Sequence, residues 1–241
     1  MQVRVGSVRG RVIQAVFLAV ALGGCAGSAD GGATASGNPS AGSTGAKGAP
    51  TANAATASGG TIGASGSACE LPVSFDIAKD WKAKGIDAER ELSKASKGAK
   101  GAKGSDGDVT GAFADAFLRQ GPVTTACEID AKPAGKIGFL RVWTGKPGNA
   151  DTRTVLRQFV AAEDNTSKET YRSFKTSDGV SGVEVDYLYT SKLLEETKKE
   201  RALAVSTPDG PVVLHLGGLD TEEHKAMLPA YELAKQTLRI L

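Results

Sequence analysis

Apolar residues are distributed very unevenly along this chain. One short apolar run, Val12–Leu22, is interrupted only by Gln14. From Cys25 to Ala68 the chain consists almost wholly of Gly, Ala, Ser, Thr, Asn and Pro, and Ile62 is the one bulky apolar side chain. Such a segment cannot bury enough apolar surface to offset the entropy lost on ordering. We therefore predict a disordered tether over residues 25–68 and a folded domain over residues 69–241.

Within the folded domain, alternating apolar and polar positions predict strands. These are expected at Leu71–Ile77, at Glu128–Trp143 with a turn at Pro133–Gly135, and at Tyr171–Lys175, Val183–Thr190, Arg201–Ser206 and Val212–Leu216. Turn sequences at Asp178-Gly179 and Pro208-Asp209-Gly210 indicate hairpins, and therefore an antiparallel sheet. The strand Val212–Leu216 is nearly all apolar, so we expect both of its faces to be covered.

Apolar residues at helical spacing predict the elements that cover the sheet. The expected helices are residues 86–93, 108–119, 149–163 and a C-terminal helix through Met227, Tyr231, Ala234 and Leu238. Asn149 or Asp151 is the expected cap of the third helix, and Asp220-x-x-Glu223 resembles a capping box at the start of the last. Pro229 is expected either to begin the main part of that helix or to kink it. The predicted fold class is α+β, an antiparallel sheet sandwiched by helices.

A lysine-rich insertion interrupts the domain at residues 93–107. The segment SKASKGAKGAKGSDG contains four lysines and four glycines. It can be interpreted as a flexible, solvated surface loop or as a basic arm for anionic headgroups or wall polymers. The surface loop is the simpler interpretation.

The N-terminal segment predicts export and anchoring. Three arginines precede the apolar run, which at about 11 residues of 1.5 Å each is too short to cross a hydrocarbon core of roughly 30 Å. Residues 1–24 therefore read as a signal peptide. The sequence Leu22-Gly23-Gly24-Cys25 resembles the bacterial lipobox, in whose precursors the cysteine receives a diacylglyceryl group bearing chains such as palmitate. An ordinary secretory signal with an incidental cysteine is the alternative.

Charge and motif content narrow the possible functions. The chain has 29 Lys and Arg against 27 Asp and Glu, and loss of the three signal-peptide arginines leaves a net charge near −1. No excess of positive charge is then left to recruit nucleic acid. The sequence contains no nucleophile elbow, phosphate loop or dinucleotide fingerprint. We expect a monomer that is not an enzyme, with no catalytic residues and no cofactor.

The cysteines predict one disulfide. With Cys25 lipidated, Cys69 and Cys127 are left as a pair, each in an Ala-Cys-Glu sequence at the start of a strand. An exported location permits a bridge between them, and two separate buried thiols are the alternative.

Two histidines are too few for a recognisable metal site, and we predict none. His224 is most simply a surface residue. His215 lies inside an apolar strand, where a polar group must find a partner. One hypothesis places Arg141 and His215 with Glu184 or Asp186 in a polar cluster that lines a ligand pocket. The alternative is a satisfied structural network.

Two stretches carry a family resemblance: CEIDAKPAGKIGFLRVWTGKPG, and GPVVLHLGGLDTEEHKAMLPAYELAKQTLR near the C-terminus. They resemble actinobacterial lipoproteins related to the Lpq-type lipoproteins of mycobacteria, whose domain is similar to the PsbP fold. The resemblance covers roughly residues 69–241 and implies docking to other macromolecules, without a defined active-site motif. We therefore expect an interaction module, lipid-anchored on the outer face of the cytoplasmic membrane, with an unknown protein or cell-wall partner. The alternative is a small-molecule or lipid carrier with a cavity between sheet and helices.

Overall fold

The computed structural model describes residues 56–88, 90–91, 93–94 and 118–241. The described residues all belong to one compact unit. The predicted signal peptide, the lipobox cysteine and most of the predicted tether lie outside the described residues. So do nearly all of the lysine-rich insertion and of the helix predicted over residues 108–119.

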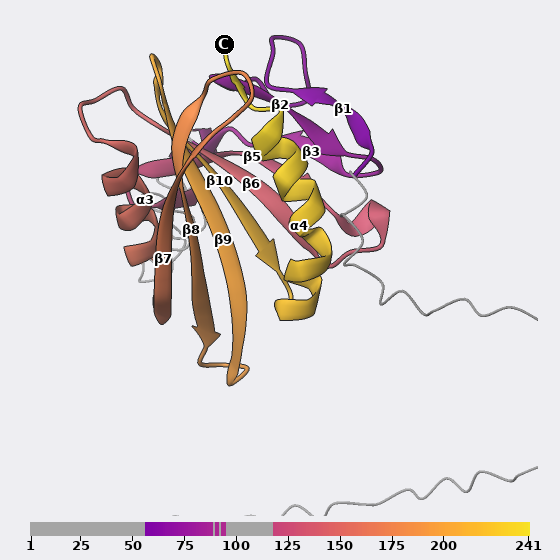
Figure 1. The fold of residues 1–241 in the computed structure, drawn as a ribbon, viewed down its shortest axis with the longest axis vertical. Helices are drawn as coiled ribbons and strands as arrows, with labels where there is room; N and C mark the ends of the chain where they lie inside the picture. The colour runs from indigo at the N-terminus through magenta and orange to yellow at the C-terminus, as the bar shows by residue number, and fades with distance from the viewer. Residues whose placement is uncertain (1–55, 89, 92, 95–117) are drawn as a thin grey trace, which may run out of the picture. The chain divides into compact units, whose positions relative to one another are not determined.

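A large antiparallel sheet forms the centre of the domain (Figure 1). In spatial order its strands are β3 (Lys82–Gly85), β5 (Val123–Asp130), β6 (Gly138–Gly145), β10 (Gly210–Gly218), β9 (Glu196–Thr207), β8 (Ser181–Ser191) and β7 (Thr166–Lys175). The short β4 (Arg119–Gln120) pairs with β5, and the 3-10 turn η1 (Lys132–Ala134) joins β5 to β6. The predicted strands and hairpins are confirmed, while β3 and β4 were not predicted.

A second, small sheet contains β1 (Ser58–Ile62), β2 (Val73–Ala78) and β11 (Arg239–Ile240), with β2 in the middle. The folded unit therefore begins earlier than predicted, because β1 lies within the segment expected to be a tether. Ile62 is 5% exposed and belongs to the core beside β2.

Glycines in β1 and directly after it allow this segment to lie close to the backbone of β2. A Cβ atom at Gly63, whose φ is +114°, would collide with the carbonyl oxygen of Val73. The glycines of this segment, which are predicted from the sequence to lie in a disordered tether, thus make this close approach possible. Backbone pairing with β2, together with the single apolar anchor Ile62, orders the segment.

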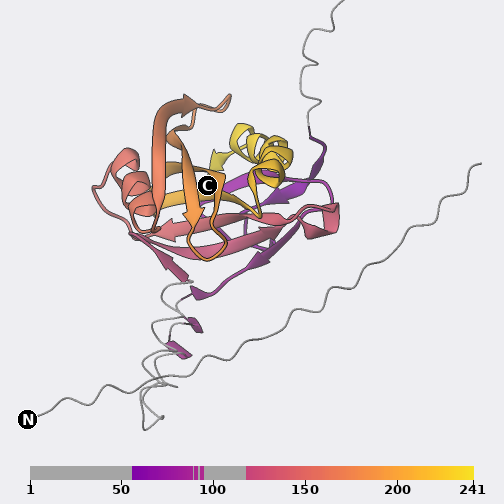
Figure 2. The same ribbon diagram turned by 90° about the horizontal axis from the view of Figure 1, so that it is seen from below.

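Helices α3 (Thr152–Ala161) and α4 (Thr221–Gln236) lie on opposite faces of the large sheet (Figure 2). Asp151 caps α3 by accepting a hydrogen bond from the Thr154 amide at 3.0 Å. Asp220 caps α4 by accepting from the Glu223 amide at 2.8 Å. Pro229 lies inside α4 and does not begin it. The predicted α+β class is confirmed.

Two separate cores fill the spaces between the sheet and its helices. Along β10, Leu214 and Leu216 face α4, whereas Val213 faces α3 and packs with Trp143. Because a strand alternates its side chains between two faces, the nearly continuous apolar sequence of β10 serves both cores. The predicted covering of both faces is confirmed.

The predicted disulfide between Cys69 and Cys127 is present, with a Cα–Cα distance of 5.9 Å. It joins the segment before β2 to the middle of β5, and both cysteines are buried. Closing a loop over a sequence separation of 58 residues stabilises the domain by about 4 kcal/mol in the chain-entropy model. The bridge therefore ties the small sheet to the large one.

Candidate ligand-binding site

Helix α3 is too short to cover its whole face of the sheet. Its ten residues span about 15 Å, whereas the twelve residues of β9 span about 40 Å. Beyond the apolar core under α3, this face of β9 continues with Glu200 and then Lys198. The uncovered end of the face carries first a layer of buried polar groups and then a pocket.

His215 is the centre of the polar layer. Its Nε2 lies 2.9 Å from Glu200 Oε2 and 3.1 Å from the Tyr187 hydroxyl. The Tyr187 hydroxyl also donates to Glu163 Oε2 at 2.8 Å. His215, Glu200 and Tyr187 are all buried, so each polar group finds a partner inside the protein, as burial requires. This agrees with the alternative that placed His215 in a satisfied network.

Burial raises the pKa of Glu163 and raises that of Tyr187 well above its ordinary value, so the phenol stays protonated and can donate. Burial alone would also raise the pKa of Glu200. The hydrogen bond with His215 and the positive charge of Lys198 outweigh burial, and the pKa of Glu200 is lowered. Glu200 is therefore an ionised carboxylate inside the protein.

Lys198 connects the polar layer to the pocket. Its Nζ lies 2.8 Å from Glu200 Oε1 and donates to the Gly218 carbonyl oxygen at 2.7 Å. An ammonium group has three N–H donors, so these two contacts leave one donor for a further acceptor. Lys198 is also part of the pocket wall.

We call the pocket at this end of the sheet the end pocket. It has a volume of about 720 Å³ and lies where β6 and β9 begin and where β5, β8 and β10 end. Its apolar wall consists of Ile137, Phe139, Tyr189, Leu194 and Leu219. Three of these are largely exposed: Ile137 at 58%, Leu194 at 64% and Leu219 at 52%. The end pocket is thus a hollow with apolar walls that open to solvent.

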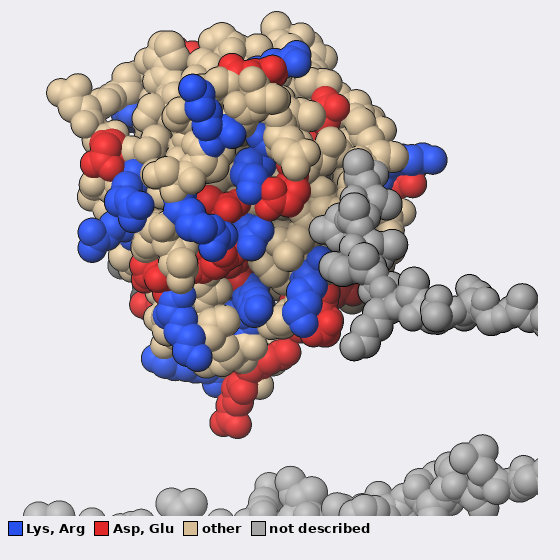
Figure 3. All heavy atoms as spheres, in the orientation of Figure 1, with Lys and Arg blue, Asp and Glu red and all other residues tan. Residues whose placement is uncertain are grey.

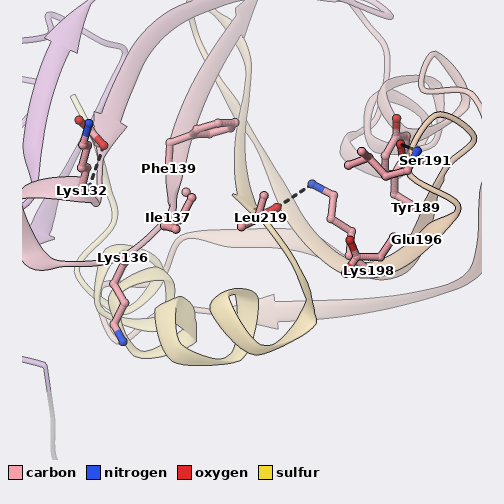
Figure 4. Close-up of a pocket in the computed structure, with 13 residues that line it drawn as sticks. Lys132, Lys136, Ile137, Phe139, Tyr189, Ser191, Glu196, Lys198 and Leu219 are labelled. Carbon is pink, nitrogen blue, oxygen red and sulfur yellow. Dashed lines mark hydrogen bonds between the residues drawn. The ribbon is translucent and has the colours of Figure 1, made fainter. Parts of the chain in front are cut away.

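Charged side chains occupy mainly the edge of the end pocket. Figure 4 shows Lys198 reaching inward toward Leu219, whereas Lys132 and Lys136 lie at the outer edge and Lys136 points away. Asp130 and Glu196 also contribute to the lining, so positive and negative charges nearly balance. The inward donor of Lys198 is therefore the main polar feature that a ligand would meet.

The walls of the end pocket resemble those of a small-molecule binding site. Within residues 56–88, 90–91, 93–94 and 118–241, no group of three or more His, Cys, Asp or Glu side chains could hold a metal ion. The apolar walls of the end pocket surround one inward-facing ammonium group. Concave apolar walls with few polar groups are typical of small-molecule binding sites.

The hypothetical cluster of Arg141, His215 and Asp186 does not form. Arg141 lies opposite His215 in the pairing of β6 with β10, but its Nε donates to Glu128 Oε2 at 2.8 Å. Its guanidinium also stacks 3.8 Å from the centre of the Phe139 ring. Asp186 belongs to the opposite face of the sheet, because Tyr187, its neighbour in β8, is the residue that faces His215.

Asp186 and Glu184 instead belong to ion pairs on the α4 side. Arg201 binds both Asp186 and Glu232, and Lys235 lies 3.0 Å from Glu184. Figure 3 shows basic and acidic side chains interleaved over this face, with no large patch of either sign. These ion pairs hold α4 against the sheet. Counting alternate residues along β8 would have placed Glu184 and Asp186 on the face opposite to Tyr187, and therefore apart from His215.

The prediction that His224 is a surface residue is wrong. His224 is 2% exposed and lies in the first turn of α4, on the same side of the helix as Met227 and Tyr231. Its Nδ1 has no hydrogen-bond partner among the described residues. Burial lowers its pKa to about 4, so the ring is neutral at pH 7. The spacing of three and seven residues from Met227 and Tyr231 was the signal that could have shown this.

Comparisons with known proteins assign no activity to this chain. The solution structure of cyanobacterial PsbP (CyanoP) from Synechocystis sp. PCC 6803 is similar at 11% identity and a TM-score of 0.42, over 76% of this chain and 98% of that chain. A likeness of this size carries no inference about function. No curated protein matches the chain.

The described residues contain no helix long and apolar enough to span a membrane. The model of a family described as "Uncharacterised lipoprotein" matches residues 39–238. This match covers most of the chain, and the protein therefore belongs to this lipoprotein family.

Proposed function

We propose that this protein is a lipid-anchored, non-enzymatic binding protein on the outer face of the cytoplasmic membrane, and that its end pocket holds a lipid-like amphiphile. Membership of a lipoprotein family supports the anchor. The lipobox-like sequence before Cys25 supplies the residue for acylation, and two acyl chains give stable attachment where one gives only reversible binding. The relation to actinobacterial Lpq-type lipoproteins is part of the same proposal.

One observation carries the proposal for the end pocket. Exposed Ile137, Leu194 and Leu219 surround a hollow of about 720 Å³, and the Lys198 side chain forms part of its wall. The volume falls within the range of roughly 300 to 1,000 Å³ that is usual for small-molecule sites. Concentrated apolar exposure on a folded domain marks an interaction site. An apolar chain would cover these walls and remove them from water.

The polar layer determines what kind of head group fits. Glu200 and the Gly218 carbonyl oxygen hold the Lys198 ammonium group at the wall. A ligand that covered this group without accepting its third hydrogen bond would leave a buried donor unsatisfied, at a cost of about 1 to 3 kcal/mol. The preferred ligand therefore combines an apolar chain with an oxygen acceptor, as in a carboxylate, an ester or a phosphate.

The position of the pocket differs from that expected for a carrier. The predicted cavity lay between sheet and helices, where the structure has packed cores on both sides. The end pocket lies beyond α3 instead. Docking to a protein or cell-wall partner is the second candidate function, and the 91% exposure of Leu193 beside the pocket favours it.

A fluorescence titration tests the proposed ligand class. The chain from residue 26 onward retains the whole compact unit and can be titrated with a dansylated fatty acid. We expect saturable binding at one site, abolished by Leu219→Asp because a carboxylate then lies in the apolar wall. Leu241→Asp is the matched control, since Leu241 is 59% exposed and does not line the end pocket. Equal probe binding by the two variants would refute the site.

A further inference from the structure

We infer that the turn between β8 and β9 inserts into a lipid bilayer and brings the mouth of the end pocket to the membrane. We call Leu193 and Leu194, at this turn, the leucine tip. The inference rests on the proposed function in one respect, because it names the bilayer as the source of the amphiphile. The insertion of the leucine tip itself stands on separate observations.

The first observation is where apolar side chains are exposed. Six large apolar residues are exposed among those described: Ile137, Leu193, Leu194, Leu219, Ile240 and Leu241. Ile137, Leu194 and Leu219 line the end pocket. Leu193 lies beside it, two residues after the lining residue Ser191. The other two are at the C-terminus, at the opposite end of the domain in Figure 1. Most of the exposed apolar side chains therefore gather around the end pocket.

The second observation is that the leucine tip is held in a projecting, ordered turn. Strands β8 and β9 remain paired up to Ser191 and Glu196. The amide of Leu194 donates to Ser191 Oγ at 3.2 Å, and the hydroxyls of Thr190 and Thr197 lie 2.9 Å apart. In Figure 1 this hairpin extends beyond the helices at the lower end of the sheet. A preformed turn loses little conformational entropy when it inserts.

The charges beside the leucine tip indicate what drives insertion. Lys192 precedes the tip, and Glu195 and Glu196 follow it, with Lys198 and Lys199 further along β9. These charges nearly cancel, so attraction to an anionic surface contributes little. Burial of the leucines among lipid chains is then the main contribution, and binding should depend only weakly on salt.

A bilayer fits this surface better than a soluble partner because of where the protein resides. The lipoprotein family and the lipobox-like cysteine place the domain beside a membrane. Leu194 belongs both to the leucine tip and to the pocket wall. Insertion of the tip by about 5 to 10 Å, the usual depth of interfacial elements, would therefore bring the exposed wall residues Leu219 and Ile137 to the headgroup region. An acyl chain could enter the pocket without crossing water.

The test is co-sedimentation of the unanchored chain, residues 26–241, with vesicles of phosphatidylglycerol and phosphatidylcholine in equal parts. We expect wild-type protein to sediment with the vesicles, and Leu193→Asn to weaken its partitioning about tenfold. Leu241→Asn is the control and should partition as wild type does. Failure of the wild type to sediment, or equal partitioning of Leu193→Asn, would overturn membrane insertion and leave a macromolecular partner for this surface. A steep loss of binding with added salt would also overturn it.

The same proteins titrated with the dansylated fatty acid separate this inference from the proposed function. Leu193 does not line the end pocket, so Leu193→Asn should bind the probe with wild-type affinity. Probe binding without vesicle binding contradicts the inserted tip and supports the pocket. Vesicle binding without probe binding supports the tip and contradicts the pocket. Because the Leu193 side chain is 91% exposed, Leu193→Asn should have the melting temperature of the wild type. An unchanged melting temperature excludes misfolding of the variant.

Discussion

Lys198 and Glu200 point to the same side of β9 and form an ion pair of 2.8 Å, in which the glutamate is buried and the lysine reaches the end pocket. The other carboxylate oxygen of Glu200 lies 2.9 Å from His215 Nε2. The Glu200 carboxylate therefore links His215, at the centre of the polar layer, to Lys198 in the wall of the end pocket.

Glu200→Gln should lower the free energy of unfolding by about 2 to 4 kcal/mol, because it removes the anionic partner of Lys198 and leaves buried polar groups imperfectly matched. Denaturant unfolding at pH 7 measures this loss. The double variant Glu200→Gln/Lys198→Met should lose less than the sum of the two single variants, since the pair acts as a unit. Glu196→Gln, an exposed carboxylate of the same strand, is the control and should unfold as wild type does. Strict additivity in this cycle would show that the ion pair is not coupled.

The buried His224 should make the domain less stable in mild acid. Its folded-state pKa of about 4 lies below its ordinary value of 6.5, so the unfolded chain takes up a proton more readily than the folded one. The stabilisation from the neutral ring is fully present above pH 6.5 and is lost as the pH falls from 6.5 towards 4. The loss is at most about 3 kcal/mol. Arg201 and His215 also disfavour the charged ring, whereas Glu200 and Asp186 oppose them.

His224→Leu removes the titrating group and should flatten the dependence of unfolding free energy on pH between 4 and 6.5. Urea unfolding over this pH range compares the variant with wild type. An identical pH dependence for both proteins would assign the acid sensitivity to other groups.

Gly63→Ala tests whether β1 belongs to the folded domain. The new Cβ would meet the Val73 carbonyl oxygen at a backbone φ of +114°, so we expect a loss of at least about 2 kcal/mol in thermal or denaturant unfolding. Gly60→Ala is a matched control, because Gly60 has a similar φ of +121° and nothing within 4 Å of an added Cβ. A loss for Gly63→Ala no larger than that for Gly60→Ala would show that β1 does not pack on β2 in solution.

Short-range signals predicted most of the fold. The turn at Pro208-Asp209-Gly210 and the capping sequence beginning at Asp220 each depend on residues that are neighbours in the chain. The nearly continuous apolar sequence of β10 correctly predicted two covered faces. The disulfide followed from Cys69 and Cys127 as the pair left once Cys25 is lipidated.

Features that depend on distant parts of the chain could not be predicted in the same way. β1 is ordered by backbone pairing with β2, and this pairing leaves no apolar pattern in the sequence. The end pocket combines residues from five strands and their connections. His215 was singled out correctly as a buried polar group. Its partners Glu200 and Tyr187 depend on strand register, which the sequence does not specify.

The most direct test of the amphiphile-binding pocket is native mass spectrometry of the chain from residue 26 onward, purified without detergent after equilibration with a lipid extract. We predict a one-to-one complex with a single lipid-like amphiphile in the wild type and in Leu241→Asp, and its absence in Leu219→Asp. A wild-type protein that carries no such molecule, or a Leu219→Asp variant that carries it equally well, would contradict the assignment of the end pocket.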